Sequence, residues 1–239
     1  MAYPTIVSVR EFKGNSDDIP KLVPMPGVIN TGDLLIMIFN VAGFGNSISA
    51  PTNWTSLGGS TNGVGTAAAF AKRADGTEDG TTVSVTHGNF AGVTRAVAQT
   101  YRITGWPEND PLTLDVKSAV NEDNGTAITF DGLTPGWGPG VETLWLTMLA
   151  INGNENVVSP SAGFTIYRTT AVGSFMTVST AYYSSTDETI TPGDWTLDNS
   201  GNCIVFTIGI RAASSAPPGD LVVYADSPSM VIRQEVAIY

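Results

Sequence analysis

The chain has 239 residues, of which 42 % are hydrophobic and 14 % charged, and its formal net charge is −11. This length suits one large all-β domain or two small ones. Because phosphate binding depends on clustered basic side chains, the negative charge and scattered Lys and Arg argue against a nucleic-acid partner. The 26 glycines and 14 prolines favour short strands joined by turns over long helices.

The N-terminal stretch 1–15 has no basic segment followed by an apolar one, so we expect no signal peptide. The apolar run from Leu34 to Phe39 has six residues. It falls far short of the about 20 that cross a bilayer, so no membrane partner is expected. Cys203 is the only cysteine and lies among apolar residues, where we expect a small buried hydrophobe and no disulfide.

Strand-like segments rich in Val, Ile, Thr and aromatic residues recur roughly every ten residues. They span residues 5–12, 33–42, 64–73, 81–86, 93–104, 112–119, 126–131, 143–151, 164–169, 174–184 and 203–212. Turns are expected at Asp75-Gly76, Asp79-Gly80, Asn124-Gly125 and Asp131-Gly132, which accept positive φ. No helical periodicity is sustained, so the predicted fold is all-β, an antiparallel β-sandwich of jelly-roll type.

Two of these segments, 33–42 and 143–151, are apolar on both faces, which is typical of central strands covered on both sides. Leaving three such side chains exposed would forgo on the order of 5–9 kcal/mol. That loss is comparable with the net stability of a whole domain, about 5–15 kcal/mol. Either the other half of the chain or a neighbouring subunit is therefore expected to cover the second face.

An internal similarity links the two segments. Residues 33–51 resemble 142–160 without gaps at an offset of 109 residues, which places Asp33 on Glu142 and Pro51 on Pro160. The same offset places Arg102 on Arg211. Chance similarity of β-rich sequence is the alternative. We predict a degenerate duplication with halves near 1–106 and 107–212, forming one sandwich over 1–212 or two packed sandwiches.

No residue pattern indicates catalysis or a cofactor. The single histidine, His87, has no nucleophile-elbow sequence to partner it, and a loop or strand-end role is favoured. The glycine-rich stretch 58–65 lacks the Gly-Lys-Ser/Thr of a phosphate loop and is expected to be a flexible loop. One His and one Cys are too few ligands for zinc.

Acidic stretches and large aromatic residues are two other kinds of candidate site. The acidic stretches 74–80, 120–125 and 185–189 lack the spacing of an EF-hand loop, so no metal is predicted and turn chemistry is favoured. Core or interface packing is favoured over a sugar-stacking platform for the large aromatic residues. These residues are Trp54, Trp106, Trp137, Trp195, Tyr182 and Tyr183.

Residues 213–239 are predicted to form a linker and a C-terminal strand extension. Residues 212–220 are typical of a linker of small residues and proline. In 230–239, apolar and polar residues alternate as in a strand. This strand either adds to an edge of its own sheet or pairs with a neighbouring subunit. The candidate assembly residues are Leu221, Val222, Val223, Tyr224, Val231, Ile232, Val236, Ile238 and Tyr239.

The chain resembles a loose family found mainly among phage and prophage virion proteins. The resemblance rests on Pro26-Gly27-Val28, Gly32 to Leu35, Pro51 to Thr55, Lys72 to Glu78 and Arg95 to Arg102, and is best over residues 20–115. It departs from the family where Ile103 follows Tyr101-Arg102, since glycine is common there. The family implies a non-enzymatic β-sandwich or jelly-roll module of tails, fibres or capsid surfaces.

The resemblance and the extension together lead to a functional expectation. The chain is expected to be a virion structural protein on the head or tail, a decoration, cement or fibre-like component made in the bacterial cytoplasm. Its expected partners are other virion proteins and further copies of itself, with a trimer favoured. A receptor- or carbohydrate-binding adhesin that recognises a host surface glycan is the first alternative, and a polysaccharide hydrolase is the second.

Overall fold

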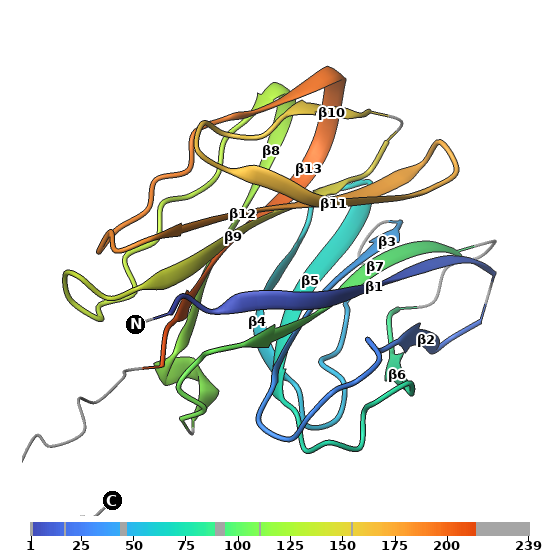
Figure 1. Ribbon diagram of the computed structural model, residues 1–239. Coiled ribbons are helices and arrows are strands. Elements are labelled where there is room, and N and C mark those ends of the chain that lie inside the picture. Colours follow the sequence, from blue (N-terminus) through green and yellow to red (C-terminus); the bar gives the residue numbers. More distant parts are fainter. Residues whose placement is uncertain are drawn as a thin grey trace, which may run out of the picture.

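The computed structural model describes residues 2–16, 18–43, 47–88, 94–109, 111–153 and 155–213. Within these ranges the regular structure is almost entirely strand, with one short 3₁₀ turn, η1 (Leu112–Leu114). Two antiparallel sheets face each other as the layers of a sandwich (Figure 1). The predicted all-β class and antiparallel sandwich are confirmed.

The first sheet has five strands in the order β1-β7-β3-β5-β4. Their bounds are β1 (Thr5–Ser16), β7 (Thr94–Thr104), β3 (Leu34–Ala42), β5 (Gly65–Arg73) and β4 (Thr55–Thr61). A separate two-stranded ladder joins β2 (Lys21–Pro24) to β6 (Thr82–Val85). In Figure 1 this ladder lies beside the first sheet, on the side away from the second sheet.

The second sheet follows the path β8-β13-β9-β12-β11, and a short strand, β10, pairs with the start of β13. Their bounds are β8 (Val116–Ile128), β13 (Trp195–Arg211), β9 (Thr143–Ile151), β12 (Met176–Ser185), β11 (Thr165–Val172) and β10 (Val157–Ser159). All of these pairings are antiparallel.

The two sheets share one strand order. If the five main strands of each half are numbered along the chain, both sheets read 1-5-2-4-3. This connectivity differs from a jelly roll, because successive strands of each half stay in one sheet instead of alternating between two. A shared order is what a duplication would produce, and the duplication itself stays a prediction.

The ungapped offset of 109 residues is wrong for the central strands β3 and β9. Leu34, Ile36 and Ile38 of β3 face the core between the sheets, and in β9 the residues that face it are Leu144, Leu146 and Met148. The two sets are 110 positions apart (Leu34 to Leu144). A shift of one residue would turn every side chain to the opposite face of the sheet.

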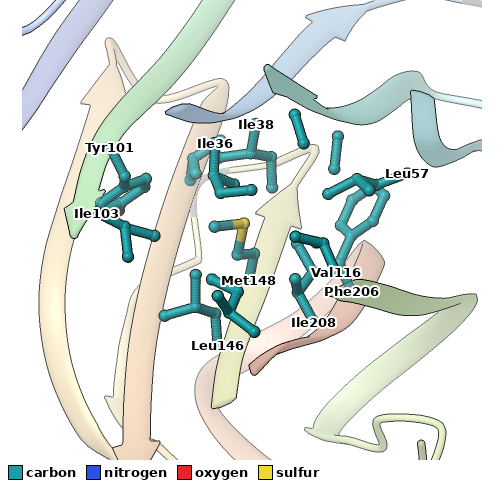
Figure 2. Close-up of a cluster of buried hydrophobic side chains, with 14 of the residues drawn as sticks. Ile36, Ile38, Leu57, Tyr101, Ile103, Val116, Leu146, Met148, Phe206 and Ile208 are labelled. Carbon is teal, nitrogen blue, oxygen red and sulfur yellow. The ribbon is translucent and has the colours of Figure 1, made fainter. Parts of the chain in front are cut away.

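The covering of the apolar run Leu34–Phe39 comes from this chain on both faces. Figure 2 shows Ile36 and Ile38 pointing toward Leu146 and Met148 in the core between the sheets. On the opposite face, Leu35, Met37 and Phe39 form a second core with the first half's own residues. Those covering residues include Val23 of β2, Val85 of β6, Met25, Ile29 and Trp54.

The second sheet is covered in the same way on its outer face. Trp145, Leu149 and Ile151 of β9 pack in a third core against side chains from the loops and strand ends of the second half. These include Ile128, Phe130, Leu133, Trp195 and Leu197. The opposite half of the chain therefore covers the inner faces of β3 and β9. Their outer faces are covered by residues of their own half, so no neighbouring subunit is needed.

Three strands escaped prediction, namely β2, β4 and β10. The strand β4 includes Gly58 and Gly59, for which the sequence predicts a flexible loop. Gly58 has φ of 126° next to a register shift, and a Cβ on Gly59 would lie 2.9 Å from the Ala67 carbonyl oxygen. The glycines are thus needed for close pairing with β5. Because glycine has a low β-propensity, a strand that contains them is not predicted from propensity.

The turn predicted at Asn124-Gly125 is also wrong. The strand β8 runs straight through both residues, and they pair with Asn202 and Gly201 of β13. Because β13 extends past this point, its ladder holds the dipeptide in the sheet. The two predicted strands 112–119 and 126–131 are accordingly replaced by one.

We expect Phe39→Ala to lower the free energy of unfolding by about 3–5 kcal/mol, because a fully buried ring is lost from the second core. Urea denaturation of the isolated chain measures the change. Val7→Ala, at a β1 position that is 46 % exposed, is the control and should shift the value by less than about 0.5 kcal/mol. An unchanged stability of Phe39→Ala would mean that the second core does not support the fold.

Candidate functional site

The predicted assembly residues, Leu221 to Tyr239, lie outside the residues that the structure describes. The described chain reaches Ala213, just beyond the end of β13. The N–H of Ala212 donates to the Glu142 carbonyl and the N–H of Ala213 donates to the Gly105 carbonyl, both at 2.8 Å. These two bonds fix the place at which the extension leaves the sandwich.

A hollow of about 460 Å³ lies at this exit. Its walls come from the turn before β9, from the end of β13 and from the segment after β7. They include Pro107, Asn109, Val141, Glu142, Arg211 and Ala213. The Glu142 Oε2 and Arg211 Nε atoms are buried and have no hydrogen-bond partner in the described part of the chain. The hollow is therefore lined by both apolar and polar residues, and these two atoms are enclosed in its wall without facing the open space.

Arg102 and Arg211, which the sequence similarity aligns, lie near or at the end of the last strand of their half, and both bind a carboxylate. The Arg102 Nε donates to Asp33 Oδ2 at 2.6 Å. Arg211 instead pairs with Asp115, which is fully buried just before β8. The expected match of Asp33 with Glu142 therefore fails at the level of contacts, which leaves Glu142 free of the Arg211 ion pair.

A buried polar cluster that the sequence does not predict joins the two sheets. Gln99 of β7 is fully buried, and its Oε1 accepts hydrogen bonds from the hydroxyls of Tyr101 and Thr180. Its Nε2 donates to Thr170 Oγ1 at 2.9 Å and to the Val178 carbonyl at 3.0 Å. Every donor and acceptor of this amide is thus used between β7 of one sheet and β11 and β12 of the other.

The cluster extends to the surface through Glu11 of β1. Glu11 Oε1 accepts from Thr170 Oγ1 and from Arg168 Nε, each at 2.6 Å. Burial acts to raise the pKa of Glu11, but the hydrogen bonds from Arg168 and Thr170 outweigh it and lower the pKa. Burial raises the pKa of the Tyr101 hydroxyl. A fully bonded cluster of this kind fixes the register of two sheets and leaves no group free to react.

His87 lies just after β6 and forms an isolated bridge with Ile48, as expected of a strand-end histidine. The ring is buried, its Nδ1–H donates to the Gly88 carbonyl at 2.8 Å, and its centroid lies 6.3 Å from that of Phe39. Burial lowers its pKa, which keeps the ring neutral near pH 7. These contacts make His87 part of the second core.

Cys203 is confirmed as a small buried hydrophobe. It is fully buried in the third core, and burial, followed by the charges of Glu155 and Asp123, raises the pKa of its thiol to about 12. A thiol in this state is a poor nucleophile.

The acidic stretch 74–80 forms a structural loop. Glu78 is buried, pairs with Lys72, and accepts from the N–H groups of Asp75 and Gly76. Hydrogen bonds from the Thr77 hydroxyl and N–H, then from Lys72, lower the pKa of Asp75 to about 2. Over the described ranges no three His, Cys, Asp or Glu side chains are grouped to hold a metal ion.

Packing explains most of the aromatic residues. Trp54, Trp106 and Trp195 are buried, so they offer no stacking platform for a sugar. Trp137 is half-buried, and its Nε1–H donates to the Leu114 carbonyl. Tyr183 packs on Phe164 with ring centroids 5.5 Å apart.

Tyr182 packs against the core between the sheets, as expected, and it also faces a depression. It lines a hollow of about 180 Å³ together with Tyr3 and Tyr167. The rings of Tyr167 and Tyr182 meet edge to face, with centroids 6.0 Å apart. Three tyrosines that are each half-buried thus surround one small depression.

No helix in the described part of the chain is long and apolar enough to cross a membrane. Comparison of the chain with protein-family models, curated proteins and solved structures finds no match. The resemblance to phage virion proteins therefore stays a prediction.

We expect Glu11→Gln to destabilise the fold at pH 7 by less than about 1 kcal/mol, because its partner Arg168 is half exposed. The folded-state pKa of Glu11 is lowered, so its contribution is present above the unfolded pKa of about 4.3 and is lost as pH falls through the folded pKa. Chemical denaturation at a series of pH values should show the difference from the wild-type chain closing below pH of about 4. A difference that persists at lower pH would contradict this assignment.

Proposed function

We propose that the chain is a non-enzymatic structural protein of a phage virion, a decoration, cement or fibre-like component of the head or tail that acts through protein–protein assembly. One observation carries the proposal. In the described part of the chain, the buried groups capable of chemistry, such as His87, Cys203 and Glu78, are engaged in packing or in ion pairs within the fold. What remains is a packed sandwich whose described chain ends beside Gly105 and Glu142.

The sequence resemblance supports the virion context, and the position of the exit supports assembly. Residues 214–239 follow directly on a chain end anchored to Gly105 and Glu142. A firmly held departure point suits an arm that holds a neighbour. The apolar faces of β3 and β9 are covered within the chain and are not open to a neighbouring subunit, so the arm is the element that we propose for self-association, with a trimer favoured.

Removal of residues 221–239 should leave the thermal unfolding of the sandwich nearly unchanged and abolish incorporation into particles and self-association. Solution mass and particle incorporation measure the two effects. The matched control is a chain of full length with Ser227 and Ser229 changed to Ala, which alters the arm without removing its apolar residues. A truncated chain that assembles as well as the full chain would overturn the proposal.

A carbohydrate-binding adhesin is the second candidate, and the tyrosine hollow favours it. Tyr3, Tyr167 and Tyr182 present aromatic rings and hydroxyls around a depression with no charged side chain in its lining. Aromatic rings of this kind pack against the apolar face of a neutral sugar.

If the chain is an adhesin, Tyr182→Ala should weaken its binding to host-surface glycans by tenfold or more, which is a loss of about 1.4 kcal/mol in binding free energy. Glycan-array binding gives the measurement, and Tyr183→Phe, on the opposite face of β12, is the control. Binding that is absent in the wild-type chain, or that survives Tyr182→Ala, would count against the adhesin.

A further inference from the structure

The Gln99 cluster brings a hydroxyl, a carboxylate and a primary amide into one chain of contacts. Thr170 Oγ1 donates to Glu11 Oε1 at 2.6 Å and accepts from Gln99 Nε2 at 2.9 Å. Because each group is bonded within the fold, none is free to react with an outside molecule. A nucleophile, a base and an acyl carbon are nevertheless neighbours of one another, which is the arrangement that acyl transfer requires.

Thr170 has the surroundings of an activated nucleophile. A hydroxyl is a weak nucleophile unless an adjacent base accepts its proton. The hydroxyl of Thr170 donates to Glu11, and the bond from Arg168 Nε to the same carboxylate oxygen, at 2.6 Å, holds this base in place. Burial acts to raise the pKa of Glu11, but the hydrogen bonds from Arg168 and Thr170 outweigh it and lower the pKa. The carboxylate is therefore ionised at pH 7 and can accept a proton.

Gln99 has the surroundings of an activated acyl group. Its Oε1 accepts hydrogen bonds from the hydroxyls of Tyr101, which Figure 2 shows in the core between the sheets, and Thr180. Donors at this oxygen stabilise the negative charge that develops on it when a nucleophile attacks the carbon. Burial raises the pKa of the Tyr101 hydroxyl, so this group stays protonated and remains a donor at neutral pH.

Gln99 and Thr170 are also close enough to react. Because an amide C–N bond is about 1.33 Å long, the 2.9 Å contact with Nε2 places Thr170 Oγ1 within about 4.2 Å of Gln99 Cδ. The terminal torsion of a glutamine is broad, so its amide can turn the face of the carbonyl toward this oxygen, at the about 3–3.5 Å from which attack proceeds. Gln99 is fully buried and Thr170 is 1 % exposed, so bulk water does not compete.

We infer that Thr170 and Gln99 join in an ester bond within the chain, which links β11 of the second sheet to β7 of the first. Thr170 Oγ1 attacks Gln99 Cδ while Glu11 accepts the hydroxyl proton. The C–N bond then breaks, Glu11 passes the proton to the nitrogen, and ammonia leaves. One C–O bond replaces one C–N bond, the hydroxyl proton ends on ammonia, and nothing is oxidised or reduced.

The ester makes the contact between the two sheets covalent. Residues 99 and 170 belong to different sheets and to different halves of the chain, so the sheets cannot separate without breaking the bond. A link between distant positions also restricts the unfolded chain and so stabilises the fold, as a disulfide does. The inference follows from the cluster and does not rest on the proposed function, so either can fail without the other.

The first test is the mass of the folded full-length chain after incubation at neutral pH. The wild-type chain should be lighter than its sequence by about 17 Da, the mass of the ammonia released in acyl transfer. Tryptic digestion should give residues 96–102 joined to residues 169–211. Alkali should then separate these peptides and leave a carboxyl group at position 99. A wild-type chain of full mass, or a loss of ammonia located at any other residue, would overturn the inference.

The second test uses variants of the nucleophile. Thr170→Val keeps the shape of the side chain without its hydroxyl, so this chain should retain its full mass. Thr170→Ser restores a hydroxyl and should regain the ester. Thr169→Val makes the same change at the next, exposed position of β11 and is the control, which should form the ester as the wild-type chain does. Loss of ammonia from Gln99 in the Thr170→Val chain, or no ester in the Thr170→Ser chain, would contradict the assigned nucleophile.

The third test concerns the base. Glu11→Gln should slow ester formation by about a hundredfold or more, because general base catalysis contributes at least this much. The final product should be unchanged, so the stability of this variant is compared with that of the wild-type chain only when both carry the same covalent structure.

The pH dependence of the reaction gives a second measure of the same role. Protonated Glu11 cannot accept a proton, so the wild-type rate should fall as pH drops through its folded-state pKa, which lies below the usual value of about 4.3. A rate that responds neither to Glu11→Gln nor to acid would show that Glu11 is not the base and would refute this mechanism.

Discussion

The burial of the central strands β3 and β9 on both faces is the constraint on which the rest of the structure depends. Neither strand can be covered by the opposite sheet alone, since a sheet facing one side leaves the other side in water. The chain therefore builds three apolar layers, one between the sheets and one outside each. The small ladder of β2 and β6 and the long connections of the second half exist to complete the outer layers.

This constraint also determines where polar groups are found. Gln99 faces the layer between the sheets, where an unbonded amide would be costly, and it is fully bonded to Tyr101, Thr170, Thr180 and Val178. Directional bonds of this kind fix one relative position of the two sheets, which apolar packing alone specifies poorly. The cluster therefore fixes the relative position of the two sheets.

Most strands could be predicted from β-propensity and from apolar runs such as Leu34–Phe39, because these patterns are local. The strand β4 could not, because its glycines are selected by the close approach of Ala67. Asn124-Gly125 is a strong turn signal that the β13 ladder overrides. Apart from Tyr101, the hydrogen-bond partners of Gln99 lie more than 70 positions away along the chain, as does the ion-pair partner of Arg211, and no local pattern reports them.

The contacts around the hollow at the exit also could not be predicted from the sequence. Glu142 and Arg211 were noted as aligned residues, but their unused atoms become visible only when the three-dimensional contacts are known. Two halves with the same strand order need not keep the same contacts. Asp33 satisfies Arg102 within the first half, whereas Asp115 takes that role for Arg211 and leaves Glu142 available.

The pairing of the first and last strand of each half has a consequence for synthesis of the chain. Thr5 pairs with Thr104, and Val116 pairs with Ile210, so each sheet joins the two ends of its own stretch of sequence. On the ribosome, the first sheet can close as soon as residue 104 has emerged, before any strand of the second has been made. The nascent first sheet must then wait with its inner face bare until the second arrives. During that interval the apolar inner face of the first sheet is exposed to water, whereas in the finished molecule the second sheet covers it.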